Sequence, residues 1–423
     1  MWFILHIFLW IIAATLTLPL AVFGLECLLA VLTHRVCSVP AIVQRPHLAI
    51  LVPAHNEAPG IAATLHNIQT QLRPNDRLIV IADNCTDQTA TVARQCDPLI
   101  EVLERHDPDH RGKGFALAYG VDHLRSAPVP EPTSTPEIVI IIDADCQLAP
   151  GALDALAVAC LDHAGHPARP AQAVYLMDPP PNPTPRDYLS TLAFLFKNQV
   201  RPLGLHVLAG PCLLTGTGMA FPWQLLAGSQ PITQTQPSLS LATANIVEDM
   251  QLGLDLAHLG HPPYLCPHAL VTGQLPSASA AVRTQRQRWE HGHLHTLLVQ
   301  APRLLLAGLV TLRPTLFLLG LELSVPPLSL LVTLWGVGLC VTLVGGWLAQ
   351  SASANIRWGP LVLLLAAGLC MLLGVVAGWV RFARKRVPGR VFLLTPLYIL
   401  WKVPMYIGFL FHRQRSWIRT ARN

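Results

Sequence analysis

Four carboxylates lie just after short apolar runs and have clear potential for chemistry: Glu57, Asp83, Asp143 and Asp145. Two aspartates one residue apart, directly after a run as apolar as Ile138–Ile142, are costly to bury unless a cation neutralises them. Carboxylate oxygens suit Mg²⁺ or Mn²⁺, which readily share their coordination with a diphosphate. We therefore expect a divalent cation at Asp143 and Asp145, and the alternative is a turn whose aspartates cap a helix.

A second acidic pair and a basic aromatic motif stand further along the chain. Glu248 and Asp249 open a predicted helix, where two acids would also simply favour the helix N-terminus. Gln285, Arg288 and Trp289 place an amide, a bidentate cation and a flat ring within about one helical turn. The cation suits a diphosphate and the ring suits the apolar face of a sugar. The alternative is a basic stretch near a membrane with an interfacial tryptophan.

The framework that must position these side chains is predicted to be a mostly parallel α/β sheet. Three short, β-branched runs bounded by polar or turn residues are typical of buried strands. These runs are His47–Val52, Arg77–Ala82 and Glu137–Ile142. Gly60–Leu72 and Asp87–Cys96 predict helices between them. Because an open α/β sheet presents ligands at the carboxyl ends of its strands, the carboxylates are expected at one edge.

Three segments rich in Pro, Gly, Ser or Thr interrupt this pattern and predict surface loops or insertions. They are Ala127–Pro136, Pro167–Pro185 and Gly228–Thr243.

The distribution of charge excludes a purely soluble protein. Only 13% of the residues are charged and 52% are hydrophobic, whereas an ordinary soluble protein has about a quarter charged residues. Met1–Thr33 carries Glu26 as its only charge, and Pro314–Val380 carries only Glu322 and Arg357. Such stretches cannot form a solvated surface, but they are long enough to cross a bilayer.

These patterns divide the chain into a water-compatible domain with membrane segments on both sides. The predicted segments are a transmembrane anchor at 1–33, the α/β domain at 46–298, an interfacial helix at 302–312, transmembrane helices at 315–380 and a basic interfacial or re-entrant segment at 381–423.

The basic C-terminal segment predicts the orientation in the membrane. Ten lysines and arginines and no acid follow Val380, although the net charge of the whole chain is only +5. Basic segments beside apolar spans mark the cytoplasmic face, where anionic lipids attract them. Nucleic acid is the other partner that such charge would suit, but the aliphatic and aromatic residues of the segment fit a membrane surface better. We therefore expect a lipid bilayer and no nucleic acid as partner.

The order and spacing of the motifs resemble the membrane-embedded family 2 glycosyltransferases, the group of cellulose, hyaluronan and poly-N-acetylglucosamine synthases and of ceramide glucosyltransferase. The resemblance covers about Leu48 to Leu298. The family series Asp, Asp-x-Asp, Glu-Asp and Gln-x-x-Arg-Trp is matched by Asp83, Asp143-Ala144-Asp145, Glu248-Asp249 and Gln285/Arg288/Trp289. Further similarities are Val52–Glu57, Arg111–Gly114 and the glycine-rich Leu214–Phe221. Departures at His55, Ala82 and Val247 remove no residue with an implied catalytic role.

The resemblance implies a GT-A fold, a Rossmann-like α/β domain, with a site for a nucleotide-sugar donor. Asp83 would contact the nucleoside of the donor, with Glu57 nearby. Asp143 and Asp145 would hold the diphosphate through Mg²⁺ or Mn²⁺, and Lys113 is expected to contact the donor as well.

The resemblance also implies how the sugar would be transferred. Asp249 would be the general base that takes the proton of the acceptor hydroxyl, and Glu248 would contact the substrate. Gln285 and Arg288 would bind the departing diphosphate, and Trp289 would pack near the acceptor sugar. A base on the face of the ring opposite the leaving group predicts inversion at the anomeric carbon, without a second carboxylate as nucleophile.

The predicted protein is thus an inverting glycosyltransferase of the bacterial plasma (inner) membrane with its catalytic domain in the cytoplasm. It would move a sugar, from a UDP-sugar, to a growing polysaccharide or glycan of the cell envelope, with proteins of a synthase or export complex as further partners. One alternative is an enzyme that adds a single sugar to a lipid or lipid-linked acceptor. The other is an inactive scaffold that binds a nucleotide sugar within a synthase complex.

Overall fold

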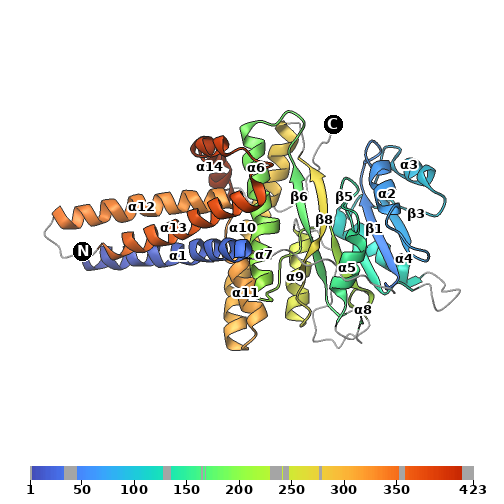
Figure 1. The fold of residues 1–423 in the computed structure, drawn as a ribbon, viewed down its shortest axis with the longest axis horizontal. Coiled ribbons are helices and arrows are strands. Elements are labelled where there is room, and N and C mark those ends of the chain that lie inside the picture. Colours follow the sequence, from blue (N-terminus) through green and yellow to red (C-terminus); the bar gives the residue numbers. More distant parts are fainter. Residues whose placement is uncertain are drawn as a thin grey trace. The chain divides into compact units, whose positions relative to one another are not determined.

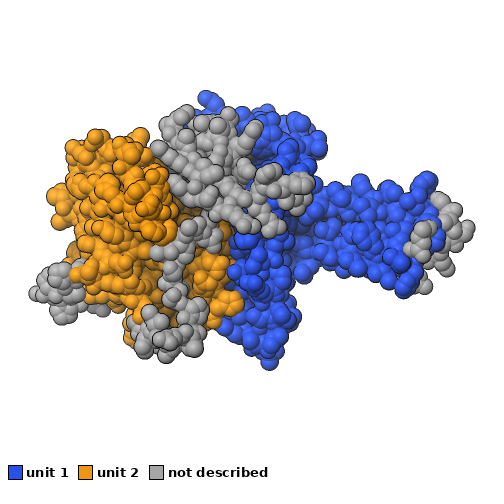
Figure 2. Space-filling view, turned by 180° about the vertical axis from the view of Figure 1, so that it is seen from behind, with its two compact units in different colours: residues 1–34, 181–210, 290–414 blue, residues 35–180, 211–289, 415–423 orange. Residues whose placement is uncertain are grey.

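The computed structural model describes residues 2–32, 45–126, 135–162, 165–166, 168–228, 241, 247–275, 279–351 and 358–411, with backbone alone at 279–289, 351 and 410–411. The chain divides into two compact units, coloured separately in Figure 2. The sheet unit comprises residues 35–180, 211–289 and 415–423, and the helical unit comprises residues 1–34, 181–210 and 290–414. We describe each unit by itself.

The sheet unit contains an eight-stranded mixed sheet with the strand order β3-β2-β1-β4-β7-β6-β8-β5 (Figure 1). Strands β3, β2, β1 and β4 are parallel to one another, and β7 is antiparallel to both of its neighbours. Strand β6 pairs with β8 in parallel, and β5 runs antiparallel to β8. The bounds are β1 Leu48–Ala54, β2 Arg77–Asp83, β3 Glu101–Arg105, β4 Ile138–Ile141, β5 Gln147–Leu148, β6 Ala171–Asp178, β7 Met219–Pro222 and β8 Tyr264–Gln274.

Helices cover the sheet, and they are α2 Ile61–Gln69, α3 Thr89–Cys96, α4 Lys113–Ser126, α5 Ala152–Cys160, α8 Trp223–Ala227 and α9 Glu248–His258. The central strands β1, β2 and β4 are buried along almost their whole length, as strands with helices on both faces must be. Helix α4 packs closely on them, because a Cβ at Gly120 would lie 3.1 Å from Cδ1 of Ile81. The α/β prediction is confirmed, as are the three predicted strands, which are β1, β2 and β4, and the two predicted helices, which are α2 and α3.

One predicted loop is wrong. Pro167–Pro185 contains β6, whose first seven residues are all buried. The prolines that suggested a loop, Pro170 and Pro179, flank this strand, and the apolar run between them is long enough to span the sheet. For the other two predicted loops, most of Ala127–Pro136 and most of Gly228–Thr243 lie outside the described residues.

The helical unit is built around α1 (Trp2–Leu32), α12 (Leu328–Ser351) and α13 (Gly359–Gly378), which lie side by side in Figure 1. Its remaining elements are α6 Pro185–Leu195, the π-helix η1 Phe196–Val200, α7 Arg201–Val207, α11 Pro314–Ser324, the π-helix η2 Trp379–Ala383, the 3₁₀-helix η3 Gly389–Leu394 and α14 Thr395–Phe411. Helix α10 (Ser279–Val310) begins in the sheet unit and continues in the helical unit.

Among the described residues, four helices are long and apolar enough to cross a membrane: Trp2–Leu32, Leu328–Gln350, Gly359–Ala383 and Gly389–Phe409. The first three fall in segments predicted to span, and α11 ends at Ser324, just before Pro326-Pro327. The expected interfacial helix at 302–312 is not a separate element, because α10 continues through Pro302 to Val310. Helix α14 lies at one end of the three-helix bundle rather than alongside it (Figure 1). An interfacial role for α14 stays a prediction.

Candidate active site

The loops after β1 and β2 bind to each other and fix the first part of the site. Asn56 and Asn84 adopt left-handed φ angles of 56° and 50°, which asparagine tolerates better than most residues and which turn the chain sharply after each strand. The Asn56 side chain donates to Oγ1 of Thr86 at 3.0 Å and accepts from the Thr86 backbone at 2.7 Å. The Glu57 backbone N–H donates to Oγ1 of Thr89 at 2.8 Å. Glu57 is therefore held on this edge of the sheet.

Asp83, the last residue of β2, is buried in an ion pair. Nη1 of Arg105 donates to its Oδ1 at 2.6 Å, and Nδ2 of Asn84 donates to the same oxygen at 3.0 Å. Arg105 also binds Asp107 at 2.9 Å and stacks its guanidinium over the Phe115 ring, 5.7 Å from the centroid. Arg105 ends the short edge strand β3, which the sequence pattern does not predict, so no local signal points to this role of Arg105.

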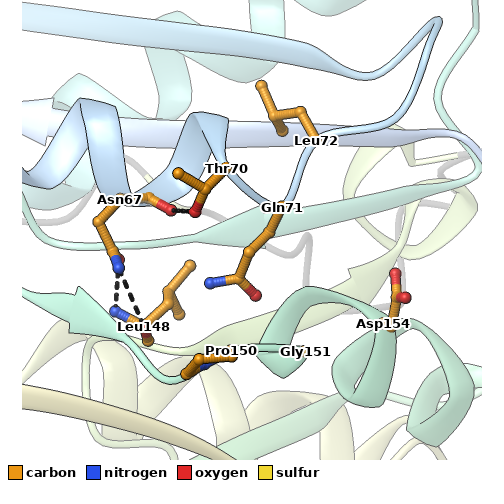
Figure 3. A pocket seen from close by; sticks show the side chains of 8 residues that line it. All are labelled: Asn67, Thr70, Gln71, Leu72, Leu148, Pro150, Gly151 and Asp154. Atoms are coloured by element: carbon orange, nitrogen blue, oxygen red, sulfur yellow. Dashed lines mark hydrogen bonds between the residues drawn. The ribbon is translucent and has the colours of Figure 1, made fainter.

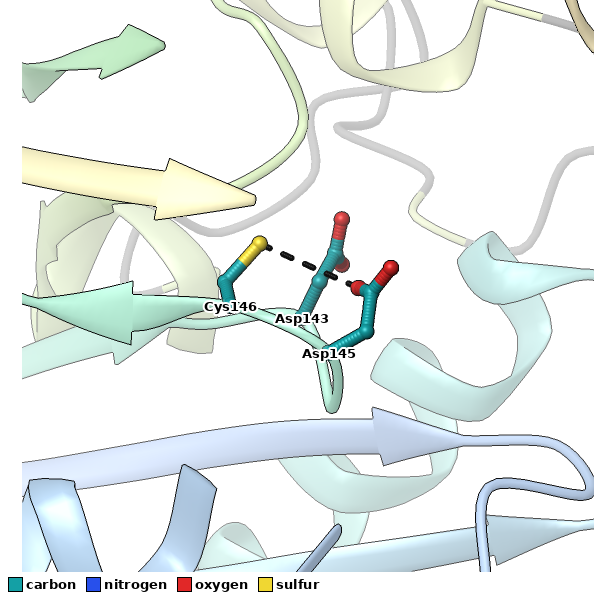
Figure 4. A group of neighbouring side chains, drawn as sticks. All are labelled: Asp143, Asp145 and Cys146. Carbon is teal, nitrogen blue, oxygen red and sulfur yellow. Dashed lines mark hydrogen bonds between the residues drawn. The ribbon is translucent and has the colours of Figure 1, made fainter. Parts of the chain in front are cut away.

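Asp143 and Asp145 lie in the turn between β4 and β5 together with Cys146 (Figure 4). One ligand atom from each of these three residues lies within 4.8 Å of the others. The backbone N–H of Asp143 donates to Oγ1 of Thr217 at 3.0 Å, which anchors the turn against the glycine-rich segment. Two carboxylates this close to each other are a fitting donor set for Mg²⁺ or Mn²⁺.

The Cys146 thiol is a poorer ligand for such a cation. Burial raises its pKa well above the ordinary value, and the charges of Asp145 and Asp143 add to this. The sulfur therefore stays a neutral thiol, and Sγ donates weakly to Oδ1 of Asp145 at 3.8 Å. The hard oxygens remain as the ligands that a divalent cation would prefer.

Lys113, at the start of α4, connects the two aspartates to the glycine-rich segment. Its Nζ donates to Oδ1 of Asp143 and, at 2.6 Å, to the carbonyl oxygen of Gly216. Burial alone would lower the pKa of Lys113, but the charge and hydrogen bond of Asp143 outweigh it, and Glu248 and Asp249 contribute further. The net effect is a raised pKa, so the ammonium is charged at neutral pH.

Asp249 reaches the same place from the first turn of α9. A Cβ at Gly216 would lie 3.2 Å from Oδ2 of Asp249 and 3.6 Å from Nζ of Lys113. Gly216 has a φ of +93°, which disfavours any residue with a side chain, so both its conformation and its close neighbours favour glycine. The structure thus brings Asp143, Lys113 and Asp249 together around this glycine.

The predicted residues at the C-terminal end of the sheet unit are only partly placed. Gln285, Arg288 and Trp289 belong to the first turns of α10, but their side chains lie outside the described ones. Their roles remain predictions.

A separate hollow in the sheet unit, with a volume of about 490 Å³, lies between the end of α2 and the start of α5 (Figure 3). Its polar side chains are engaged in structural bonds. Asn67 bonds the backbone of Leu148 in both directions, at 3.1 and 2.7 Å, and Asp154 accepts from Arg73 at 2.7 Å. None of the carboxylates expected to do chemistry lines it.

The described side chains can bind an anionic ligand and accept a proton at one site. Asp143 and Asp145 offer a cation site, Lys113 supplies a fixed positive charge, and Asp249 supplies a carboxylate beside the glycine-rich segment. This combination suits transfer of a group away from a diphosphate.

Comparison with known proteins agrees with this chemistry. Residues 46–292 match the family described as "Glycosyltransferase like family 2". A 4,4'-diaponeurosporenoate glycosyltransferase from Staphylococcus aureus is 40% identical over 77 residues, which cover 18% of this chain and 20% of that enzyme. The match thus spans only about a fifth of that relative's length.

A solved structure shares the fold. It is a mannosyltransferase from Pyrobaculum calidifontis in complex with GDP-Man and Mn²⁺, with 21% identity, coverage of 96% of this chain and 100% of that chain, and a TM-score of 0.52. The family match covers more than half of this chain, so the chain belongs to family 2 of the glycosyltransferases, with the GT-A fold and with apolar helices of membrane-spanning length.

Proposed function

We propose that this protein is an inverting membrane-bound enzyme that transfers a sugar from a nucleotide-diphosphate donor, a UDP-sugar, to a growing glycan of the cell envelope. The observation that carries the proposal is the meeting of Asp143, Lys113 and Asp249 at Gly216. It provides a binding site for a charged leaving group next to a carboxylate that can receive a proton.

The donor side is formed by the carboxyl ends of β2 and β4. Asp83, oriented by Arg105, would hold the nucleoside with Glu57 beside it. Asp143 and Asp145 would hold Mg²⁺ or Mn²⁺, and the mannosyltransferase that shares the fold was solved with Mn²⁺. When bound, the cation neutralises the charge that develops on the departing diphosphate. Lys113, with Gln285 and Arg288, would bind the same oxygens as the sugar leaves.

The acceptor side is formed by Asp249 and the segment around Gly216. The acceptor oxygen would attack the anomeric carbon, while the bond from that carbon to the diphosphate oxygen breaks and its electron pair leaves with the diphosphate. The hydroxyl proton passes to Asp249. Attack from the face opposite the leaving group inverts the anomeric carbon, with Glu248 and Trp289 contacting the acceptor.

A second candidate is the addition of one sugar to a lipid or lipid-linked acceptor. The helical unit favours it, because its three side-by-side helices are few for a channel that passes a polar chain. The relative from Staphylococcus aureus is named for a single compound, 4,4'-diaponeurosporenoate, rather than for a polymer.

The test is turnover by the purified full chain with a panel of labelled UDP- and GDP-sugars, with Mn²⁺, Mg²⁺ or EDTA. Mass analysis of the product identifies the donor, the acceptor and the number of sugars added. A lipid-linked product with one added sugar would support the second candidate, and a longer glycan would support the first. Asp249→Asn should lower kcat by about 100-fold or more, since a positioned base contributes about 10²–10⁴-fold. The control Asp255→Asn alters another aspartate of α9, which accepts from Gln251 instead, and should keep kcat within about twofold of wild type.

Two results would contradict the proposal. Turnover by Asp249→Asn at the wild-type rate would show that Asp249 is not the general base. If the wild type binds nucleotide sugars but neither transfers the sugar nor hydrolyses the donor, the protein would instead be an inactive scaffold that binds a nucleotide sugar within a synthase complex.

A further inference from the structure

Lys402 is a charged residue inside an apolar helix that no motif explains. It lies in α14 within the span Gly389–Phe409, and its side chain is only 6% exposed. Its Nζ forms an ion pair with Oε1 of Glu290, which lies 112 residues earlier in the sequence. A buried ion pair is weak evidence for stability, because well-packed apolar residues in its place are often as stable or more so. An ionisable group in such a segment points to a role beyond packing.

Lys402 belongs to a polar stripe along one face of α14. Tyr398, Lys402 and Tyr406 follow one another at four-residue spacing, which places them on one side of a helix. Lys402 lies 5.2 Å from the centroid of the Tyr398 ring, and the Tyr398 hydroxyl is 3.2 Å from Oγ of Ser190 on α6. The Tyr406 hydroxyl is 2.6 Å from Oγ of Ser329 on α12. The stripe is therefore held in a fixed orientation from two sides.

Helix α14 holds α10 at two consecutive residues. Glu290 receives the ion pair from Lys402, and Nε2 of the buried His291 is 3.2 Å from the carbonyl oxygen of Met405. The His291 ring also packs edge-on against Phe409, with 5.2 Å between centroids. Both contacts come from α14, so they define where this part of α10 lies along and around its own axis.

Glu290 immediately follows the motif Gln285/Arg288/Trp289 on the same continuous helix. With about 1.5 Å of rise per residue, the backbone of Arg288 is only about 3 Å along the axis from that of Glu290. A helix transmits a shift or rotation at one residue directly to its neighbours. We propose that Lys402 is a positioning residue for the transfer reaction, which sets the axial and rotational place of the diphosphate-binding motif through Glu290. This inference rests on the proposed function.

The test compares Lys402→Met, which keeps the length of the side chain and removes its charge, with Lys402→Arg in the purified full chain. If Lys402→Met displaces the motif, kcat should fall about tenfold or more, since a small misplacement of reacting groups can lower the rate by up to about 10²-fold. The donor KM should change less than about threefold. Lys402→Arg should recover most of this kcat. Arg186→Met is the matched control, because Arg186 stacks over Trp401 of α14, 5.0 Å from the ring centroid, and should leave kcat within about twofold.

Combination with Arg288→Ala separates positioning from general damage. If Lys402 acts through the motif, the loss in Lys402→Met/Arg288→Ala should be clearly smaller than the product of the single losses. Glu290→Gln should lower kcat as Lys402→Met does. Melting temperature and gel filtration show whether Lys402→Met is folded. If it is not, the charge exchange Glu290→Lys/Lys402→Glu replaces it in the test and should recover kcat.

Wild-type kcat in Lys402→Met, or losses that multiply fully with Arg288→Ala, would overturn the inference while the proposed function stands. A wild type that transfers no sugar from any donor would instead overturn the proposed function, and the inference with it.

Discussion

At the scale of single residues, Lys113 connects several of the predicted site residues. It bonds Asp143 and Gly216, and the charges of Glu248 and Asp249 act on it. Its two partners lie 30 and 103 residues away in the sequence. A cation at Asp143 would take over the neutralisation of that carboxylate, and the ammonium could then turn to the phosphate oxygens of the donor.

We expect Lys113→Met to lower kcat/KM by about 10²- to 10³-fold, the range for the loss of one group that stabilises developing charge. The ion pair of Arg94 and Glu104, 2.5 Å long and on the surface of the same unit, provides the control Arg94→Met, which should be close to wild type. Initial rates at varied donor concentration measure both. A Lys113→Met enzyme with wild-type kcat/KM would show that the ammonium only stabilises the fold.

At the scale of elements, a buried charged cluster holds the helical unit together. Arg201, at the start of α7, donates to Oε2 of Glu26 in α1 at 2.6 Å and to the carbonyl oxygen of Glu322 in α11 at 2.7 Å. The π-helix η1 precedes it, and such local irregularities are frequent at functional sites. The cluster thus ties three separate helices at one point.

His293 on α10 lies beside this cluster and should make the unit sensitive to acid. Burial, together with the charges of Lys197 and Arg201, lowers the pKa of His293 to about 3. The unfolded chain binds a proton near pH 6.5, but the folded chain does not bind it until pH 3. Stability conferred by neutral His293 is therefore present above pH 6.5 and falls as the pH decreases, by at most about 1.4 kcal/mol per pH unit.

Melting curves in detergent at pH 7.5 and pH 5 should show this loss, and His293→Gln should reduce the difference between the two pH values. The neighbouring His295 is exposed, so His295→Gln should keep the wild-type difference. An unchanged pH dependence in His293→Gln would assign the acid sensitivity to other groups.

At the scale of the whole molecule, the apolar helices and the basic C-terminal segment together predict a topology. If α1, α12 and α13 span and α14 lies in the interface, then the sheet unit and residues 381–423 share the cytoplasmic side. The segment between α12 and α13 would then lie on the opposite side.

Cysteine labelling with a membrane-impermeant maleimide tests this topology, in a background in which Cys37, Cys85, Cys96, Cys340 and Cys370 are replaced by alanine, because the other five cysteines are buried. Asp109→Cys and Ser416→Cys should react only in inside-out vesicles, and Asn355→Cys only in intact cells. Reaction of Ser416→Cys in intact cells would show that α14 crosses the membrane.

The sequence alone determined the features that depend on neighbouring residues. The runs that became β1, β2 and β4, the long apolar helices and the pair Asp143 and Asp145 are all legible within a few residues, because burial and membrane insertion act on continuous apolar stretches. The motif series also sufficed to recognise the family.

Only the tertiary structure decided which distant residues meet. It placed Lys113 between Asp143 and Gly216, and it paired Arg105 with Asp83 and Lys402 with Glu290. Local patterns cannot specify such pairs, because a charged residue has the same sequence context whether its partner lies in solvent or on a strand that arrives later in the chain. The strand β6 was hidden for a related reason: its place in the sheet is defined by β7 and β8, whereas its local surroundings are proline-rich.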